Sequence, residues 1–229
     1  MDATMGSVPA PLLIAHRLPG SARECTSLAD AGAGGFELDI QLRGDAVVVS
    51  HYLPFLQISG WLEHDGARFR WGGGRILDPR LNDAAARVPG DAVVVLDPKE
   101  QRANRRHRLA GTVATTVTGG PIDLARYVVT TDDPRDLRTY RAAGIATWRT
   151  VGTEHALHDV LRAGPVADAG LAVRHTLLET GTIQKLRERA GTLAAWTVND
   201  VARARALAAR GVDAITTDST AVLRALRAR

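Results

Sequence analysis

The chain has 229 residues, of which 45% are hydrophobic and 24% charged, and its formal net charge is +4. This length and composition favour a single globular domain that spans residues 1–229. No apolar run approaches the roughly 18 residues of a membrane span, and the first residues lack the basic start and apolar stretch of a signal peptide. A transmembrane or secreted protein is therefore not expected, and the expected location is the cytoplasm.

Short apolar runs alternate with Ala/Leu/Arg-rich segments of helical period, a pattern typical of repeated strand–helix units around a parallel sheet. The expected strands are Leu12–His16, Gly35–Leu42, Ala92–Asp97, Tyr127–Thr131, Ile145–Val151, Leu171–Leu177, Leu193–Val198 and Ala214–Thr217. The expected helices are Ser21–Ala31, Leu81–Val88, Asn104–Val117, Pro134–Ala143, Glu154–Ala163, Thr182–Ala190, Val201–Arg210 and Thr220–Leu226. These alternating pairs predict an α/β fold, a closed (β/α)8 TIM barrel. An open, doubly wound sheet is the alternative.

The numbers of cysteines and arginines, and the positions of the arginines, argue against several classes of site and partner. Cys25 is the lone cysteine, which excludes an intramolecular disulfide and a zinc site built from several cysteines. Nearly all of the 29 basic residues are arginines, and they recur at intervals along the expected helices. A nucleic-acid-binding protein would concentrate them in a basic stripe, so no nucleic-acid partner is expected.

A strand followed by a tight turn carries the first chemical signal. Glu37 and Asp39 are two apart in an apolar run, so both carboxylates point to one side of the strand and need a cation between them. A second strand, Ala46–Ser50, follows a short polar turn. If this hairpin is symmetric about Gly44, His51 lies opposite Glu37. Two acids and an imidazole placed in this way suit a metal-assisted reaction that needs a proton carrier.

Polar residues also end several of the other expected strands. They are His16 and Arg17 on the first strand, Asp97 and Lys99 on the third, and Trp196 and Asn199 on the seventh. In a TIM barrel the carboxyl ends of the strands meet at one face, where reactive groups gather. Their joint occurrence there predicts one functional site.

One long segment, residues 52–80, interrupts the strand–helix rhythm. It holds half of the ten aromatic residues, namely Tyr52, Phe55, Trp61, Phe69 and Trp71. Because it follows His51, it is expected to form either an apolar wall or lid over the barrel mouth, or a small satellite core that anchors a long loop. Contact with a membrane surface through this insertion is a further hypothesis.

Several motifs, taken together, carry a resemblance to a known family. They are LLIAHR with Glu24 and Thr26 after it, then GGFELDIQLRGDAVVVSH, DPK, WTVND and GVDAITTD, and they extend from Leu12 to Asp218. In these motifs the chain resembles the glycerophosphodiester phosphodiesterases, (β/α)8 barrels that split phosphodiesters with two histidines and a divalent cation. The resemblance implies that His16 and His51 are the catalytic histidines and that Glu37, Asp39 and Asp97 bind the metal. It also implies that Arg17, Lys99 and Trp196 contact the substrate or its phosphate.

The chain departs from this family at identifiable positions. Leu18 and Pro19 stand where glycine usually follows the His-Arg pair, and Tyr52 stands where aspartate usually follows the second histidine. The third metal-binding acid is often glutamate, whereas Asp97 with Lys99 resembles the Asp-x-Lys arrangement of the related sphingomyelinase D-like phospholipases. These differences leave the identity of the alcohol or lipid group on the phosphate open.

The expected function is metal-dependent hydrolysis of glycerophosphodiester-like or other lipid-derived phosphodiesters. The three carboxylates favour one Mg²⁺ or Ca²⁺, because both ions prefer hard oxygen ligands. The two histidines would serve as general acid and general base, in an order that the sequence leaves open. One alternative is a phospholipase D-like lyase that forms a cyclic phosphate from an amphiphilic substrate. The other is a non-catalytic barrel that binds a phosphorylated ligand.

Overall fold

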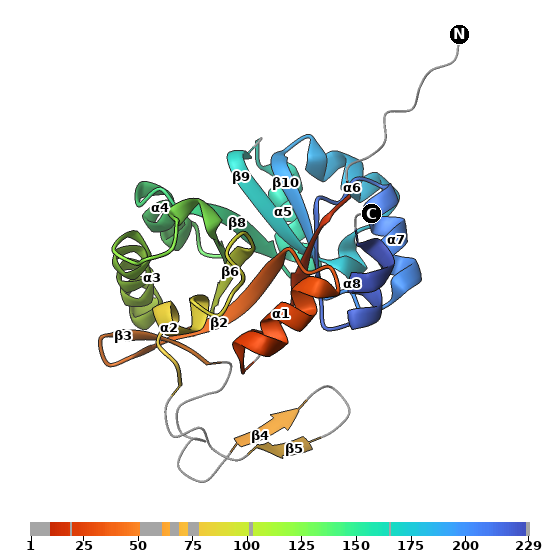
Figure 1. The fold of residues 1–229 in the computed structure, drawn as a ribbon. Coiled ribbons are helices and arrows are strands. Elements are labelled where there is room, and N and C mark those ends of the chain that lie inside the picture. The colour runs from red at the N-terminus through yellow and green to blue at the C-terminus, as the bar shows by residue number, and fades with distance from the viewer. Residues whose placement is uncertain are drawn as a thin grey trace.

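Eight parallel strands form a closed barrel at the centre of the molecule (Figure 1). The computed structural model describes residues 10–18, 20–50, 61–64, 69–72, 78–100, 103–164 and 166–227. The barrel strands are β1 (Leu12–Ala15), β2 (Gly35–Arg43), β6 (Val93–Pro98), β7 (Tyr127–Thr131), β8 (Ala146–Val151), β9 (Val166–Arg174), β10 (Ala190–Trp196) and β11 (Ala214–Thr217). They pair in the order β1-β11-β10-β9-β8-β7-β6-β2, and β2 pairs with β1 to close the ring. The (β/α)8 prediction is confirmed, and the alternative of an open sheet is wrong because of that closing pair.

Helices surround the barrel on its outer side (Figure 1). They are α1 (Ala22–Asp30), α2 (Leu81–Ala85), α3 (Ala103–Thr118), α4 (Pro134–Ala142), α5 (Glu154–Arg162), α6 (Thr180–Arg187), α7 (Val201–Ala209) and α8 (Thr220–Leu226). Local sequence explains where they start. Helix α1 begins with a capping box, in which the Ser21 hydroxyl accepts from the Glu24 N–H and the Glu24 carboxylate accepts from the Ser21 N–H. Within the described ranges, every helix is too short or too polar to span a lipid bilayer.

The inner and outer faces of the strands pack into two different cores. Alternation along each strand sends one set of side chains toward the helices and the other into the barrel. The outward set includes Phe36, Leu38 and Val173, which are fully buried against the helices. The inward set forms a small apolar floor made of Ile14, Val95, Val128, Trp148, Ala172, Ala194 and Ala214. The functional residues lie above this floor, on the same inward faces.

Trp148 closes the floor because Gly170 leaves room for it. A Cβ built at Gly170 would lie 2.0 Å from Cδ1 of Trp148, so only glycine fits beside the indole. The alanines of the neighbouring strands, Ala172 and Ala194, likewise leave space inside the barrel. One large ring among small residues therefore fills the lower barrel and leaves an open volume near the mouth.

The expected hairpin is present, with a register one residue away from the expected one. Strand β2 pairs antiparallel with β3 (Ala46–Val49), from Arg43 opposite Ala46 to Ile40 opposite Val49. The ladder is centred between Gly44 and Asp45, and not on Gly44, because both residues form the turn and Gly44 takes a positive φ of 58°. The pairing of His51 with Glu37 lies outside the described residues.

Other boundaries also differ from the sequence-based expectation. The sixth barrel strand, expected at Leu171–Leu177, is β9 at Val166–Arg174, and the one-turn 3₁₀ helix His175–Leu177 follows it. The helix expected at Thr182–Ala190 begins two residues earlier, at Thr180. From the 52–80 insertion, the structure describes residues 78–80 and the antiparallel pair β4 (Trp61–His64) and β5 (Phe69–Gly72). The proposed lid or satellite core is therefore untested.

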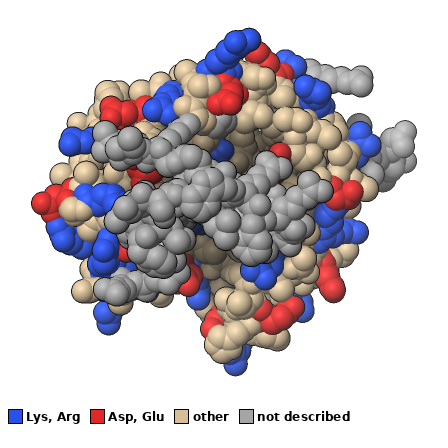
Figure 2. Space-filling model, turned by 90° about the horizontal axis from the view of Figure 1, so that it is seen from below, with Lys and Arg blue, Asp and Glu red and all other residues tan. Residues whose placement is uncertain are grey.

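Charged side chains are interspersed over the face seen in Figure 2, where blue and red groups alternate among the coloured residues and the blue ones do not form one continuous stripe.

Candidate active site

A cavity of about 340 Å³ opens at the carboxyl ends of the barrel strands. Its lower part is apolar, with Trp148, Ala172 and Ala194 from the barrel floor. Its upper part is polar, and this part is lined by His16, Glu37, Asp97, Lys99, Thr130, Thr150, Thr197 and Thr216. The cavity thus places ionisable groups next to an apolar floor.

Three carboxylates from two neighbouring strands meet at one side of this cavity. Strands β2 and β6 run in register, with Glu37 beside Val95 and Asp39 beside Asp97, so the inward faces of both strands present acids at the same level. Glu37, Asp39 and Asp97 each offer a carboxylate oxygen, and these oxygens lie within 4.8 Å of one another. Asp39 is only 4% exposed. The sequence predicted that Glu37 and Asp39 share one face of a strand, and the structure places Asp97 of the neighbouring strand beside them.

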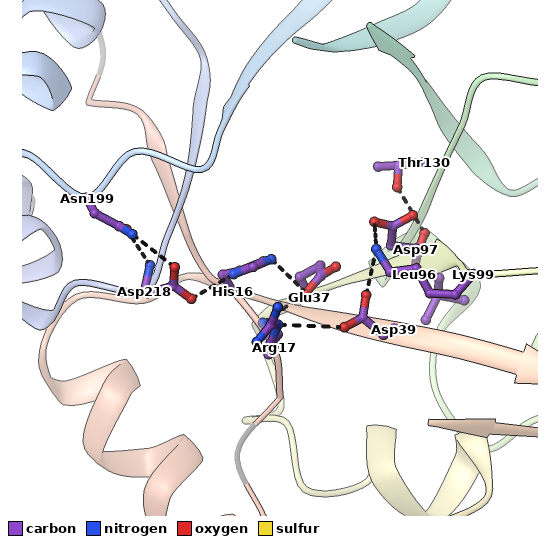
Figure 3. Close-up of polar contacts among 10 residues, drawn as sticks. All are labelled: His16, Arg17, Glu37, Asp39, Leu96, Asp97, Lys99, Thr130, Asn199 and Asp218. Atoms are coloured by element: carbon purple, nitrogen blue, oxygen red, sulfur yellow. Dashed lines mark hydrogen bonds and ion pairs between the residues drawn. The ribbon is translucent and has the colours of Figure 1, made fainter. Parts of the chain in front are cut away.

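Lys99 lies among these carboxylates (Figure 3). Its ammonium donates to Oδ2 of Asp97 at 2.5 Å and lies 2.8 Å from Oδ1 of Asp39. Burial acts to lower the pKa of Lys99, but the charges of Asp97 and Asp39 outweigh it and raise that pKa above its ordinary value. Lys99 is therefore a permanent cation that offsets part of the negative charge of the cluster.

Burial of the acids makes it costly for all three to be ionised together, even with Lys99 and Arg17 beside them. Burial, with a further contribution from the charge of Asp39, raises the pKa of Glu37 to about 8. Burial also raises the pKa of Asp97, although Lys99 opposes the change. Three convergent carboxylates whose ionised forms repel one another fit a divalent cation such as Mg²⁺ or Ca²⁺. The donor set is thus suitable for the metal that the sequence predicts.

His16 stands beside the acids and is held from behind by a second carboxylate (Figure 3). Its Nδ1–H donates to Oδ1 of Asp218 at 2.7 Å, while its Nε2 lies 4.0 Å from Oε2 of Glu37. Burial lowers the pKa of His16, but the hydrogen bond to Asp218 and the charge of Glu37 outweigh this and raise the pKa overall. His16 therefore presents Nε2 to the acidic side of the cavity with its ring orientation fixed.

Asp218 is itself positioned by Asn199, one of the polar strand-end residues. The Asn199 amide donates to Oδ2 of Asp218 at 3.0 Å and accepts from the Asp218 N–H at 2.9 Å. Burial acts to raise the pKa of Asp218, but the hydrogen bonds from His16 and Asn199 outweigh it and lower that pKa. Asp218 was not predicted as a site residue, although its place directly after β11 was a usable signal.

Arg17 connects β1 to the acids through its backbone. Its N–H donates to Oε2 of Glu37 at 2.8 Å, and its Nε lies 4.0 Å from Oδ2 of Asp39. Its φ is 63°, in the left-handed region that non-glycine residues rarely adopt. Of the two residues that depart from the family pattern after it, Leu18 packs partly buried against the outer core and Pro19 lies outside the described residues.

Trp196 forms one wall of the cavity, as its place at the end of β10 predicted. Its indole N–H donates to the carbonyl of Ala172 on β9 at 3.0 Å, which fixes the ring. His51, the second predicted catalytic histidine, lies outside the described residues. The structure thus brings together His16, Glu37, Asp39, Asp97, Lys99 and Arg17, with Trp196 lining the same cavity.

A second group of metal-ligand types lies between α3 and α4. His107, Asp133 and Asp136 also offer atoms within 4.8 Å of one another. The guanidinium of Arg106 lies within this group, 2.7 Å from Asp133 and 3.4 Å from Asp136, and the Nδ1 of His107 lies 2.6 Å from Asp136. His107 is thus the partner of a buried acid. This group already contains its own cation.

Comparison with known proteins identifies related structures through the fold. No protein-family model matches the sequence, and no curated protein matches it significantly. Among solved structures, a phosphodiesterase from Oleispira antarctica in complex with the product sn-glycerol-3-phosphate has a TM-score of 0.72 at 17% identity, over 96% of this chain and 98% of that one. Glycerophosphodiester phosphodiesterases from two other bacteria are also similar.

The enzyme from Thermotoga maritima has a TM-score of 0.64 at 18% identity, over 94% of this chain and 96% of that one. The enzyme from Parabacteroides distasonis has a TM-score of 0.65 at 18% identity, over 92% of this chain and 94% of that one. At these identities the likeness establishes the fold: the chain is a (β/α)8 barrel of the kind found in glycerophosphodiester phosphodiesterases.

Proposed function

We propose that this protein is a divalent-metal-dependent phosphodiesterase that acts on small glycerophosphodiester-like molecules. The observation that carries the proposal is the convergence of Glu37, Asp39 and Asp97 in a cavity that also holds an imidazole and an ammonium group. The fold is shared with enzymes that are named for this activity. A phosphodiester needs cations around its oxygens and proton carriers at its esters, and this cavity offers both types of group.

The three carboxylates would hold Mg²⁺ or Ca²⁺ through their oxygens. When bound, the ion supplies Lewis-acid stabilisation of the negative charge that develops on the phosphoryl oxygens. Lys99, fixed between Asp39 and Asp97, adds a second positive charge at the same place. Arg17 extends this positive side toward β1. Together, these residues would orient the phosphate so that its negative charge faces Lys99 and the metal ion held by the three carboxylates.

His16 is the described group best placed to move a proton. Its Nδ1 is occupied by Asp218, so proton transfer would use Nε2, the nitrogen near Glu37. Asp218 and Asn199 hold the ring in this orientation, as a carboxylate does for histidine in other acid–base sites. His51, on the evidence of sequence alone, is proposed as the second proton carrier. One histidine would accept the proton of the attacking hydroxyl, and the other would donate a proton to the departing alkoxide.

The proposal is tested by incubating the purified chain with glycerophosphodiesters that carry different alcohols, in the presence of Mg²⁺ or Ca²⁺. Release of glycerol 3-phosphate, which is lost with a chelator and in His16→Ala, is the expected result. Arg205→Gln is a matched control, because Arg205 is exposed on α7, outside the barrel. Equal turnover in His16→Ala and in the unaltered protein would refute the proposal.

A lyase is the second candidate, favoured by the close contact of Lys99 with Asp97. The Asp-x-Lys pair that suggested this chemistry is joined by a 2.5 Å hydrogen bond on the cavity wall. In a lyase, a hydroxyl of the substrate loses its proton and attacks its own phosphorus, the phosphorus–oxygen bond to the other alcohol breaks, and that alcohol leaves with a proton. The reaction ends at a cyclic phosphate. Phosphorus NMR of the products separates the two candidates, because a cyclic ester that persists supports the lyase and an open monoester supports the hydrolase.

A further inference from the structure

The rim of the cavity carries a cation that the catalytic proposal does not use. On β9, Ala172 lines the cavity and Val173 points into the outer core, so Arg174 returns to the inward face at the level of the mouth. Its neighbour in register on β10 is Trp196. Arg174 is exposed and does not itself line the cavity, but it lies beside Trp196, which does.

Arg174 lies over the ring of Trp196. The centre of its guanidinium is 5.4 Å from the ring centroid, which is a cation–π distance. The indole cannot turn away, because its N–H is bound to the Ala172 carbonyl and its benzene edge lies against Gly152, where an added Cβ would be 3.6 Å from the ring. One face of the Trp196 indole therefore already carries a cation of the protein.

Arg174 also differs from Lys99 in its charge balance. Lys99 contacts two carboxylates, Asp39 and Asp97. Among the described residues, no carboxylate lies within ion-pair distance of Arg174. Arg174 is exposed, and a planar guanidinium suits carboxylate and phosphate oxygens. Within the described part of the chain, the positive charge of Arg174 therefore has no carboxylate partner.

From this pair we propose that Arg174, stacked on Trp196, sets the substrate preference of the site: it favours phosphodiesters of anionic alcohols, tolerates neutral ones and disfavours quaternary ammonium alcohols such as choline. The inference rests on the proposed phosphodiesterase function and names the substrate class for it. Arg174 would repel a cationic group on an alcohol bound beside it, whereas an anionic group there would gain a partner. An exposed charge contributes modestly, so the expected effect on selectivity is about tenfold.

The test uses three glycerophosphodiesters that differ in charge and little in shape. Their alcohols are 3-hydroxypropanoate, the neutral 3,3-dimethylbutanol and choline, and the last two have the same shape. The unaltered protein should give kcat/KM values in that descending order. Arg174→Gln should lower the ratio of the anionic to the cationic ester about tenfold, and Arg174→Lys, which keeps the charge, should retain most of it. Arg205→Gln is the control and should leave the ratio unchanged.

The outcomes separate this inference from the function on which it rests. If the unaltered protein and Arg174→Gln turn over all three esters with the same ratios, the specificity inference is wrong and the phosphodiesterase stands. If the unaltered protein cleaves none of them, the proposed function is wrong, and calorimetric titration of the intact esters decides the inference. Tighter binding of the anionic ester that disappears in Arg174→Gln supports it. Equal affinities, or no measurable binding of the anionic ester, overturn it.

Discussion

Two groups of acids in this chain satisfy the same geometric condition for holding a cation, and their surroundings differ. Glu37, Asp39 and Asp97 lie at the barrel mouth on β2 and β6. The second group, His107, Asp133 and Asp136, joins α3 to α4 on the outside of the barrel. In both groups the potential ligand atoms lie within 4.8 Å of one another. Ligand spacing alone therefore does not distinguish a reactive site from a structural contact.

Access distinguishes them. The mouth group has three acids, with Lys99 between two of them and Arg17 at 4.0 Å from Asp39, and two of the acids line the cavity of about 340 Å³. In the helix group Arg106 contacts both Asp133 and Asp136. None of its members lines that cavity. Three carboxylates beside an accessible volume make the first group suited to a metal, whereas the second is a bridge between two helices.

The largest expected difference between the two groups is in activity. Asp39→Asn should lower kcat/KM on a glycerophosphodiester by at least about 10³-fold, because it removes a buried charge from the metal-binding set. Asp136→Asn should change it by less than about threefold. Steady-state kinetics on both variants, with folding checked by circular dichroism, makes the comparison. Similar losses in the two variants would contradict the assignment of the mouth group.

Proton transfer at the mouth should depend on His16 and, to a smaller extent, on its partner Asp218. His16→Asn should lower kcat/KM about 10²- to 10⁴-fold. Asp218→Asn should cost less, about ten- to a hundredfold, because it only positions the ring.

Asp218 also contributes to the raised pKa of His16. In Asp218→Asn that pKa should fall, and the limb of the pH–rate profile that reports His16 should move toward lower pH. A profile that loses height without moving would mean that Asp218 positions the ring but does not raise its pKa.

Substitutions in the helix group should lower the stability of the fold. Asp136 is 2% exposed; it forms a hydrogen bond with His107 and an ion pair with Arg106. Asp136→Asn should lower the free energy of unfolding by about 1–3 kcal/mol in urea titrations, since it leaves Arg106 with one contact fewer and weakens a buried hydrogen bond. The control is Asp159→Asn, whose surface contacts with His155 and Arg162 should contribute no more than about 0.5 kcal/mol. Equal costs would show that burial does not matter here.

The smallest expected effect is a pH-dependent contribution to stability from Asp133, at the start of α4. Burial acts to raise the pKa of Asp133, but the hydrogen bond from the Arg135 N–H and the charge of Arg106 lower it below its ordinary value. A carboxylate with a lowered pKa stabilises the fold above its unfolded-state pKa, and this contribution is lost as the pH falls through the folded-state pKa. Asp133→Ala should therefore cost about 1 kcal/mol at pH 7 and progressively less below about pH 4. A cost that is independent of pH would exclude the charge as its source.

Much of the fold was predictable from local pattern. Strand β2 reads as an apolar strand with two inward acids, and α4 follows an Asp-Pro start, so period and capping residues were sufficient. The hairpin register was missed by one residue, because it depends on whether Gly44 alone or Gly44 with Asp45 forms the turn. That difference is a matter of backbone geometry which the residue types leave undecided.

Partnerships between distant residues were the least predictable part of the site. His16 and Asp218 are 202 positions apart and meet because β1 pairs with β11 when the barrel closes. The contacts of Arg106 with two acids of α4 likewise depend on how the helices pack. By contrast, Glu37 and Asp39 share one strand, and their common face follows from alternation. Short-range geometry could be predicted, whereas contacts created by closure and packing could not.

Metal binding by the mouth group can be measured by calorimetric titration of the purified chain with Mg²⁺ and Ca²⁺. One ion should bind per chain, with binding abolished in Asp39→Asn and retained in Asp136→Asn. Binding that persists in Asp39→Asn, or that disappears only in Asp136→Asn, would contradict the assignment of the metal site to the mouth group.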